Sequence, residues 1–399
     1  MNKGPIRILH AMTDPISTVL MRGQLAYLKA NGFAPVLLSS PGRELDQIGA
    51  EEGYPVLSVA MRREISPLSD LRSFVEIWRL LRRIKPVICN SGTPKAGLLV
   101  GLAAWLTRVP CRVYTLRGLR LETAKGLKRV LLSLTERVSC FCAHRVICVS
   151  DSLRERAVGL GLVARQKTLL LGAGSSNGVD PIRFAPASEK PAIAAAVRRQ
   201  LGIRPEQLII GFAGRLTRDK GLPELVTAFQ SVRGSLPETV LLLVGDFEEG
   251  DPVPRQIRDA IESDPSIHRV AFNSQVEKYY LVMNLFVLPT HREGFPNTVL
   301  EAQSSGLPVI TTDATGAVDA IDDGVTGLRV PVGDSVKLAE AMLSLLSDPV
   351  RMQSMGQSGR ERILRKFRNE VVWEALATLY RTMLTADSSV EAVQCAQVQ

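Results

Sequence analysis

The sequence lacks any apolar run long enough to cross a membrane. The longest, Leu98–Leu106, has nine residues, whereas a membrane-spanning helix needs about 20. No secretory leader pattern is visible either, so we expect a cytoplasmic protein. Hydrophobic residues make up 45% of the chain and charged residues 22%, as in soluble globular proteins. Because 399 residues are too many for one hydrophobic core, we expect two domains.

Cysteine, histidine and aromatic residues are scarce. Four scattered histidines and the lack of a C-x2-C pair argue against a zinc site. No D-x-D sequence stands in a context that suits metal binding, so we expect neither a metal nor another cofactor. Aromatic residues, at 5%, do not interleave with the basic runs, which argues against nucleic acid as a partner. We expect buried free thiols in a reducing compartment at all six cysteines: Cys89, Cys111, Cys140, Cys142, Cys148 and Cys395.

Acidic residues are few in the N-terminal half. Residues 1–185 hold 27 Lys and Arg against 13 Asp and Glu, a net charge of +14, whereas the remaining residues carry −5. The basic residues cluster at 62–63, 79–85 and 117–129. Such clusters attract an anionic membrane surface, a pyrophosphate-bearing substrate or nucleic acid. Solvated helix faces explain the same clusters equally well.

Short apolar runs alternate with helical patterns through the first half of the chain. This alternation is typical of a doubly wound α/β domain, which binds ligands at the carboxyl ends of its strands. We expect strands at 6–11, 36–39, 56–59, 87–90, 112–116 and 145–150, and helices at 17–30, 43–51, 67–84, 94–106 and 124–143.

A second α/β series follows a segment rich in Gly, Ser and Pro. Residues 172–188 contain the turn signals Asn177-Gly178 and Asp180-Pro181, which are typical of a crossing between domains. The second series has expected strands at 208–213, 240–244, 268–272, 285–288, 309–311 and 328–330. The predicted organisation is an N-terminal domain at 1–185, a C-terminal domain at 186–360, a helix at 361–385 and a disordered tail at 386–399.

The stretch THREGFPNTVLEAQSSGLP, residues 290–308, combines a loop with a fresh helix start. A helix that begins after a glycine-containing loop offers backbone N–H groups to an anion. Glu293 and Glu301 flank this point with seven residues between them. Carboxylates suit hydroxyl groups better than phosphate oxygens. The residues therefore predict a phosphate at the helix start, with hydroxyl-rich groups beside it.

This E-x7-E pattern within EGFPNTVLEA, followed by G-x-P, closely resembles the family-4 retaining glycosyltransferases of the GT-B fold. GRLTRDKG at 214–221 and GVDPIRF at 178–184 add to the resemblance. GTPKAGLL at 92–99 and YTLRGLRLET at 114–123 are similar to bacterial capsule, O-antigen and exopolysaccharide glycosyltransferases. The resemblance implies an α/β protein with two Rossmann-like doubly wound domains facing across a cleft. It also implies a last helix that crosses back to the N-terminal domain.

In the family, the C-terminal domain holds a nucleotide-sugar donor, here expected to be a UDP-sugar. Arg215 and Lys220 would clamp the diphosphate, Glu293 would contact the transferred sugar, and Glu301 the ribose. The expected catalytic residues are Glu293, Arg215 and Lys220, with the two cations meeting the charge of the leaving phosphate. No residue is expected to act as a covalent nucleophile. The other expected donor-binding residues are Gly214, Asp246, Phe272, Gly294, Phe295, Pro296, Asn297 and Thr298.

Polar residues after the N-terminal strands are the expected acceptor contacts. They are Thr13, Lys95, Arg117 and Arg120, although each of the cations could equally be a surface salt-bridge partner. The resemblance implies an acceptor sugar on a polyprenyl diphosphate carrier, or a saccharide. Residues 12–18, MTDPIST, stand where many relatives have a glycine-rich loop.

The expected function is transfer of a hexose or N-acetylhexosamine from a UDP-sugar, without a metal and with retention at the anomeric carbon. The acceptor would belong to surface polysaccharide biosynthesis, and the basic N-terminal domain would lie on the inner membrane face. One alternative is a sugar-nucleotide epimerase of the same fold. Another is a catalytically silent partner that binds sugar nucleotide or membrane.

Overall fold

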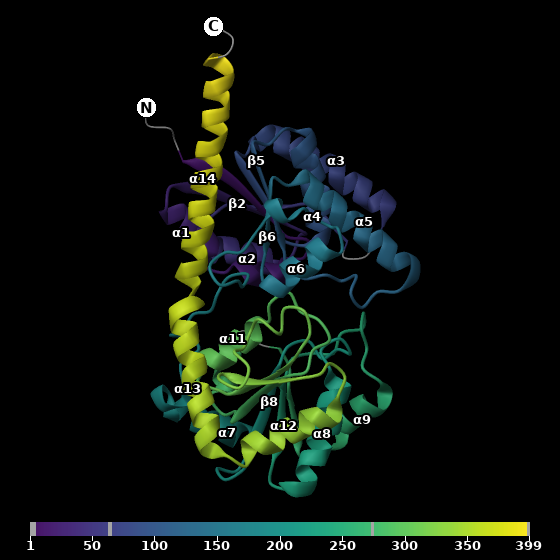
Figure 1. The fold of residues 1–399 in the computed structure, drawn as a ribbon, viewed down its shortest axis with the longest axis vertical. Helices are drawn as coiled ribbons and strands as arrows, with labels where there is room; N and C mark the ends of the chain where they lie inside the picture. The colour runs from purple at the N-terminus through teal and green to yellow at the C-terminus, as the bar shows by residue number, and fades with distance from the viewer. Residues whose placement is uncertain (1–4, 63–65, 273–274, 397–399) are drawn as a thin grey trace. The chain divides into compact units, whose positions relative to one another are not determined.

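The computed structural model describes residues 5–62, 66–272 and 275–396, with side chains up to Thr385. The chain divides into two compact units (Figure 1). Unit 1 comprises residues 1–177 and 369–399, and unit 2 comprises residues 178–368. Each unit contains one parallel β-sheet covered by helices, so the two α/β domains expected from the sequence are confirmed.

The sheet of unit 1 has seven strands in the order β3-β2-β1-β4-β5-β6-β7. Its central strands are near-continuous apolar runs because helices cover both faces of a parallel sheet. The order reverses direction between β1 and β4, and this switch point is where doubly wound domains bind ligands. The strands are β1 (Ile6–Ala11), β2 (Phe33–Ser39), β3 (Val56–Ser58), β4 (Ile88–Ser91), β5 (Cys111–Leu116), β6 (Arg145–Cys148) and β7 (Thr168–Leu169).

Two groups of helices cover this sheet. Figure 1 shows α3, α4 and α5 together over one face, and α14 beside α1 over the other. The longer elements are η1 (Pro15–Met21), α1 (Gln24–Ala30), α2 (Arg43–Glu52), α3 (Pro67–Ile84), α4 (Pro94–Leu106), α5 (Gly126–Cys142), α6 (Asp151–Gly159) and α14 (Asn369–Ala396).

The helix expected at 17–30 is divided in the structure. A 3-10 helix, η1, ends at Met21, and α1 starts only at Gln24. Gly23 between them has φ = 78°, and a Cβ atom there would overlap the indole ring of Trp373. Only glycine therefore fits this junction comfortably, which breaks the helical run.

The sheet of unit 2 has six parallel strands in the order β10-β9-β8-β11-β12-β13. Its switch point lies between β8 and β11, which are direct neighbours. The strands are β8 (Ile209–Ala213), β9 (Val240–Val244), β10 (Ile267–Val270), β11 (Leu285–Leu288), β12 (Val309–Thr312) and β13 (Gly327–Val330). Around them lie η3 (Ala187–Glu189), α7 (Pro191–Leu201), α8 (Leu222–Ser235), α9 (Arg255–Ser263), α10 (Glu277–Tyr280), α11 (Asn297–Ser304), α12 (Ser335–Leu346) and α13 (Pro349–Lys366).

The unit boundaries lie eight residues from those expected at both crossings. The first is at 177/178 instead of 185/186, because Phe184 packs on Tyr280, with ring centroids 5.7 Å apart. The second is at 368/369 instead of 360/361, because α13 continues to Lys366 within unit 2. The helix that joins unit 1 is α14, which extends to Ala396 where a disordered tail was expected. Residues 397–399 lie outside the described residues.

Five of the six cysteines are free and buried, as expected. Burial raises the pKa of the Cys89 thiol to about 12, so this group stays protonated and unreactive at neutral pH. The side chain of Cys395 lies outside the described residues.

Candidate functional site

The residues expected to bind the donor follow the two central strands of unit 2. Arg215 and Lys220 lie in the loop after β8, and Glu293 lies in the loop after β11. Since β8 and β11 are neighbours at the switch point, both loops emerge at the same edge of the sheet. The structure therefore brings together cations and a carboxylate that are more than 70 residues apart in the sequence.

Lys220 and Glu293 form an ion pair across the two loops. Their side chains are only 17% and 13% exposed, so the pair is shielded from bulk solvent far more than a surface salt bridge. Arg215 is half exposed and pairs with Glu248, in the loop after β9. Glu248 was not foreseen as a partner. Each of the two cations that the sequence predicted would bind a diphosphate is thus paired with a carboxylate in this structure.

Asp219 connects the cation loop to the carboxylate loop. Its backbone oxygen accepts hydrogen bonds from the His291 amide (2.8 Å) and the Thr290 hydroxyl (3.1 Å). Its carboxylate accepts from Arg292 Nε at 2.9 Å, and Arg292 NH2 lies 2.6 Å away. Lys220 follows Asp219 in the first loop, and Glu293 follows Arg292 in the second. These bonds therefore fix the position of Lys220 relative to Glu293.

Gly221 allows the two loops to approach so closely. It has φ = 72° and precedes α8, and a Cβ atom there would overlap the backbone oxygen of Pro289. Any other residue would push the start of α8, and Lys220 with it, away from the end of β11.

Helix α11 begins at Asn297 with no side chain capping its first turn. Its amides are therefore available to a bound anion. Asn297 Oδ1 is buried without a hydrogen-bond partner in the described residues. Phe295, an expected contact, is buried with its ring 5.5 Å from that of Phe367. Only its backbone can take part in binding.

Glu301 lies on α11 and is held by Tyr280. The Tyr280 hydroxyl donates to Glu301 Oε2 at 2.7 Å. Desolvation raises the pKa of Glu301, and the hydrogen bond from Tyr280 opposes this shift by favouring the ionised form. Tyr280 itself is fully buried against Phe184 and Phe286. The carboxylate expected to bind a ribose therefore has a fixed orientation.

Asp246 and Phe272 lie beside each other at the ends of β9 and β10. The Phe272 amide donates to Asp246 Oδ2 at 3.2 Å, and Arg269 NH1 lies 3.6 Å from the other carboxylate oxygen. The Phe272 ring is 65% exposed. A large exposed aromatic ring beside a binding loop offers a stacking surface for a planar group.

In unit 1, the expected acceptor residues Thr13 and Lys95 are held by neighbouring groups of the same unit. The Thr13 hydroxyl lies 2.7 Å from that of Thr93 and accepts from the Ala96 amide at 3.1 Å, which stabilises the start of α4. Lys95 Nζ donates to both carboxylate oxygens of Asp70, at 2.8 and 3.1 Å. The side chains of Thr13 and Lys95 are therefore largely engaged in hydrogen bonds within unit 1.

Arg117, at the end of β5, is different. Its Nε and NH1 atoms are buried and have no hydrogen-bond partner among the described residues. The guanidinium lies over Gly92, where a Cβ atom would come 3.1 Å from Nε. Burial lowers the pKa of Arg117 to about 10, so it remains charged at neutral pH. Two buried, unpartnered donors of a cation near Gly92, which follows β4, are suited to an anionic ligand. Arg120, three residues on, is partly exposed.

His10, at the end of β1, is neutral. Burial, with a smaller effect from Arg117, lowers its pKa to about 3. Its Nε2 atom lies 2.9 Å from the hydroxyl of Tyr380, which accepts from Asn90 Nδ2 at 2.8 Å. Because the Tyr380 oxygen accepts a hydrogen bond from Asn90, the Tyr380 hydroxyl can donate its own proton to His10 Nε2. This histidine is therefore a structural group of the unit 1 core.

Comparison with known proteins decides the family. A family model described as "Glycosyl transferase 4-like domain" matches residues 17–174, and one described as "Glycosyl transferases group 1" matches residues 194–362. The capsular polysaccharide biosynthesis glycosyltransferase CapM of Staphylococcus aureus is 37% identical over 95% of this chain and 97% of its own length. This chain is a glycosyltransferase of that family.

The chain is also similar to proteins at lower sequence identity. The UDP-Gal:alpha-D-GlcNAc-diphosphoundecaprenol alpha-1,3-galactosyltransferase of Escherichia coli is 26% identical over 76% of this chain and 78% of its own. Among solved structures, Anabaena HepE in complex with UDP-glucose has a TM-score of 0.79 at 18% identity, covering 94% of this chain and 99% of its own. Together with the two parallel sheets, this likeness gives the glycosyltransferase the GT-B fold expected from its motifs.

The pairings around the glycosyltransferase motifs were missed from the sequence. Asp219 stands inside the GRLTRDKG stretch, but nothing local shows that its partner is Arg292. Tyr280 lies 21 residues before Glu301, in a short helix whose apolar residues read as core. The order of strands in the sheet, which places the β8 and β11 loops together, could have indicated the Asp219–Arg292 pair. No such signal points to Tyr280, which lies in α10.

Among the described residues, no group of three or more His, Cys, Asp and Glu side chains could hold a metal ion. The expectation that the reaction needs no metal stays a prediction. Within the same residues, no helix is both long and apolar enough to cross a membrane.

Proposed function

We propose that this glycosyltransferase transfers a sugar from a UDP-sugar to a lipid-linked acceptor in the synthesis of a surface polysaccharide. The shielded Lys220–Glu293 pair at the switch point of unit 2 is the observation that carries the proposal. In the free protein Glu293 neutralises Lys220. A bound diphosphate would take over that cation and release Glu293 to accept hydrogen bonds from the sugar hydroxyls.

The remaining donor contacts follow from the same edge of the sheet. Arg215 would exchange Glu248 for a phosphate oxygen, and the uncapped start of α11 would meet the β-phosphate with backbone N–H groups. Glu301, oriented by Tyr280, would accept hydrogen bonds from the ribose hydroxyls. The base would lie against Phe272. These interactions concentrate positive charge where the leaving phosphate becomes more negative.

Transfer would proceed at one face of the sugar, with retention. The bond between the anomeric carbon and the phosphate oxygen breaks, and the acceptor hydroxyl oxygen forms the new glycosidic bond. The hydroxyl proton passes to the departing phosphate oxygen, so UDP leaves as the second product. No protein nucleophile takes part, and no metal is needed because Arg215, Lys220 and the start of α11 supply the positive charge.

Two relatives support the acceptor class. CapM is named for capsular polysaccharide biosynthesis, and the E. coli galactosyltransferase is named for a diphosphoundecaprenol-linked acceptor. In unit 1, the buried Nε and NH1 atoms of Arg117, which have no partner among the described residues, suit the diphosphate of such an acceptor. We further propose a cytoplasmic enzyme that works at the membrane surface, where such carriers reside.

The test is a panel of UDP-, GDP-, ADP- and dTDP-sugars without added metal, followed by Lys220→Ala. We expect one UDP-sugar to raise the melting temperature and to support product formation on a polyprenyl diphosphate-linked sugar. Lys220→Ala should lower kcat at least about 100-fold, as loss of a transition-state charge contact does. The melting temperature of the free protein should change little.

Lys337→Ala is the matched control, because Lys337 pairs with Glu340 on the exposed face of α12 in the same unit. It should leave kcat unchanged. Equal losses of kcat in the two variants, or a product epimerised or hydrolysed without any acceptor, would contradict the proposal. Product stereochemistry, read from the anomeric coupling constant, tests retention separately.

A further inference from the structure

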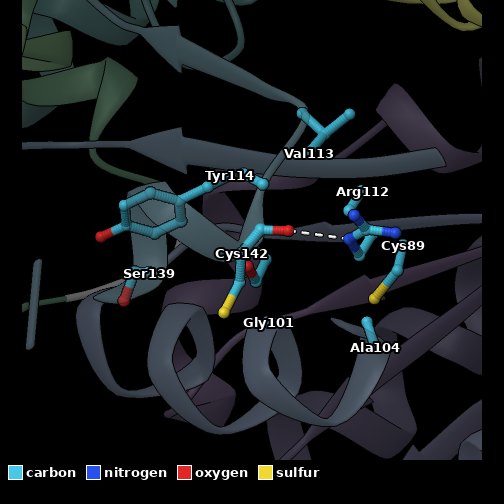
Figure 2. Close-up of a pocket in the computed structure, with 10 residues that line it drawn as sticks. Cys89, Gly101, Ala104, Arg112, Val113, Tyr114, Ser139 and Cys142 are labelled. Carbon is cyan, nitrogen blue, oxygen red and sulfur yellow. Dashed lines mark hydrogen bonds between the residues drawn. The ribbon is translucent and has the colours of Figure 1, made fainter. Parts of the chain in front are cut away.

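Helix α5 has its apolar side on the outside of unit 1. Its buried residues are Glu136, Ser139, Cys140 and Cys142, of which Glu136 accepts a hydrogen bond from Tyr114 at 2.8 Å. Figure 2 shows Ser139 and Cys142 on the inner side of the helix, beside strand β5. A helix on the surface of a globular domain normally does the reverse, with apolar residues toward the core.

The exposed apolar side chains form one stripe along the helix. Leu127 is 83% exposed and Phe141 67% exposed. At about 100° per residue, all members of the stripe fall within an arc of about 100°, opposite the buried Glu136. The stripe runs about 21 Å along the helix, given a rise of about 1.5 Å per residue. Its members are Leu127, Val130, Leu131, Leu134 and Phe141.

The end of α4 widens this stripe. Trp105 and Leu106 are also exposed, and the Trp105 ring lies 6.2 Å from that of Phe141. Figure 1 shows α4 and α5 side by side over the same face of the sheet. We call the seven residues together the α5 face. A contiguous apolar surface of this kind on a soluble domain indicates an interaction site.

Basic residues surround the N-terminal end of α5, where Lys128 flanks the apolar stripe and Arg129 lies on the other side of the helix. Lys125, Lys128 and Arg129 are exposed at the start of α5, and the first turn contains no acidic residue. No carboxylate pairs with them in the part of the chain that the structure describes. Cations at a helix N-terminus are opposed by the helix dipole and by one another. Their presence beside an apolar stripe is therefore favoured only by an external anion.

We infer that the α5 face docks on an anionic lipid surface, with its apolar side chains at the headgroup boundary and the positive charge of Lys125, Lys128 and Arg129 attracted by lipid phosphates. Apolar burial and charge attraction act together at such a surface. A second copy of the chain is a poorer partner. If two α5 faces packed together, the cations of one copy would meet α5 of the other. The glutamate of that helix, Glu136, is buried and could not pair with them.

This inference goes beyond the proposed function by naming the surface that meets the membrane. Of the three basic clusters seen in the sequence, it selects the one at 117–129, which contains the cations of α5. Docking depends on neither donor nor acceptor, so it can be tested when both are absent. A failed docking test and a failed transfer test would therefore be distinguishable.

The experiment is co-sedimentation of the full chain with vesicles of phosphatidylcholine alone or with about 30 mol% phosphatidylglycerol. We expect binding only with the anionic lipid, and weaker binding as salt rises. The variant Leu127→Ser/Val130→Ser/Leu134→Ser should bind at least about tenfold more weakly. Lys125→Glu/Lys128→Glu/Arg129→Glu should lose binding to a similar extent at low salt.

Matched controls lie on unit 2, where the same chemical changes are made at other exposed positions. They are Ile182→Ser/Val336→Ser/Val350→Ser and Arg199→Glu/Arg351→Glu/Lys366→Glu. Both controls should bind vesicles as the parent does, and circular dichroism should show that all variants fold. Equal binding by the α5 variants and the controls would overturn the inference. The inference would also be overturned if analytical ultracentrifugation without lipid showed a dimer and the triple serine variant of α5 abolished that dimer.

Discussion

Glu136 is a carboxyl group buried in unit 1 on the inner side of α5. Its side chain accepts a hydrogen bond from the hydroxyl of Tyr114, which is also fully buried. Burial raises the pKa of Glu136 from its ordinary value of 4.5 to about 7, although the bond from Tyr114 acts in the opposite direction. At neutral pH, the protein therefore has a carboxyl group close to its own midpoint of ionisation inside a domain core.

The raised pKa makes the stability of unit 1 depend on pH. Between pH 4.5 and about 7 the folded state keeps a proton on Glu136 that the unfolded state has lost. The contribution is thus fully present below pH 4.5 and is lost as pH rises through about 7. The difference corresponds to about 3 kcal/mol at most.

Glu136→Gln should remove this pH dependence while keeping the acceptor for Tyr114. We expect the melting temperature of the parent to fall relative to that of the variant between pH 5 and pH 8. Paired thermal denaturation curves at several pH values measure the difference. Two parallel pH profiles would show that Glu136 ionises at its ordinary pKa.

At the level of single residues, the candidate site residues that the sequence predicted are those that lie within a continuous sequence motif. Arg215, Lys220 and Glu293 stand in local patterns, and the strand order brings the two patterns together. Their partners could not be predicted in the same way. Glu248 and Tyr280 become neighbours of motif residues only through the packing of β9 and α10. Pairing between distant segments is set by the fold and leaves no local signal.

At the level of elements, the site in unit 2 is two loops connected by Asp219. The loop after β8 carries Lys220, and the loop after β11 carries Glu293. Asp219 accepts hydrogen bonds from three consecutive residues of the second loop, 290–292. The pair Asp219–Arg292 therefore positions Lys220 and Glu293 relative to each other.

Arg292→Ala should lower kcat/KM for the donor by about 10- to 100-fold, because small displacements of charged groups are costly in a site of this kind. Asp219→Ala should do the same, and the double variant should be little worse than either alone. The matched control is Arg329→Ala, which removes a looser pair with Asp323 in the same unit.

Donor kinetics and UDP titrations of all four variants provide the measurement. UDP affinity should fall along with kcat/KM, since in the proposed function the same loops hold the diphosphate. Additive losses in the double variant would contradict coupling between the loops. An effect of Arg329→Ala equal to that of Arg292→Ala would contradict any special role for the pair.

At the level of the whole molecule, unit 1 is made from both ends of the chain. Residues of α14, including Leu376 and Tyr380, belong to the same buried cluster as Leu25 and Leu37 near the N-terminus. Trp373 Nε1 donates to Asn177 Oδ1 at 2.6 Å, and Asn369 Nδ2 donates to the Asn177 backbone oxygen at 2.7 Å. The last helix is thus part of the unit 1 core.

Leu376→Ala should destabilise unit 1 by about 2–5 kcal/mol, as for other buried leucines. Hydrogen exchange followed by mass spectrometry should show faster exchange in residues 5–62 and 88–169 and unchanged exchange in unit 2. Leu345→Ala, in the core of unit 2, should give the opposite pattern. Faster exchange in unit 2 for Leu376→Ala would contradict the assignment of α14 to unit 1.

The sequence also predicted the two sheets and the positions of their strands apart from β7, because buried parallel strands are short apolar runs between helices. The two-residue strand β7 is too short to give such a run. It did not place the boundaries between the units. Phe184 and the end of α13 belong to unit 2 through side-chain packing, whereas the turn signals near Asn177 mark only that the chain bends. Composition shows where a crossing occurs, and packing decides which residues each core takes.

The discontinuous make-up of unit 1 sets an order on biosynthesis. When the first 177 residues leave the ribosome, the helix that completes their core has not yet been made. The ribosome must add the whole of unit 2 first, which takes about 10–40 s at about 5–20 residues per second. Unit 2 is continuous and can fold as it emerges. Apolar residues of the nascent first segment, including Leu25 and Leu37, lack their contacts with α14 during that interval, until α14 itself has been made.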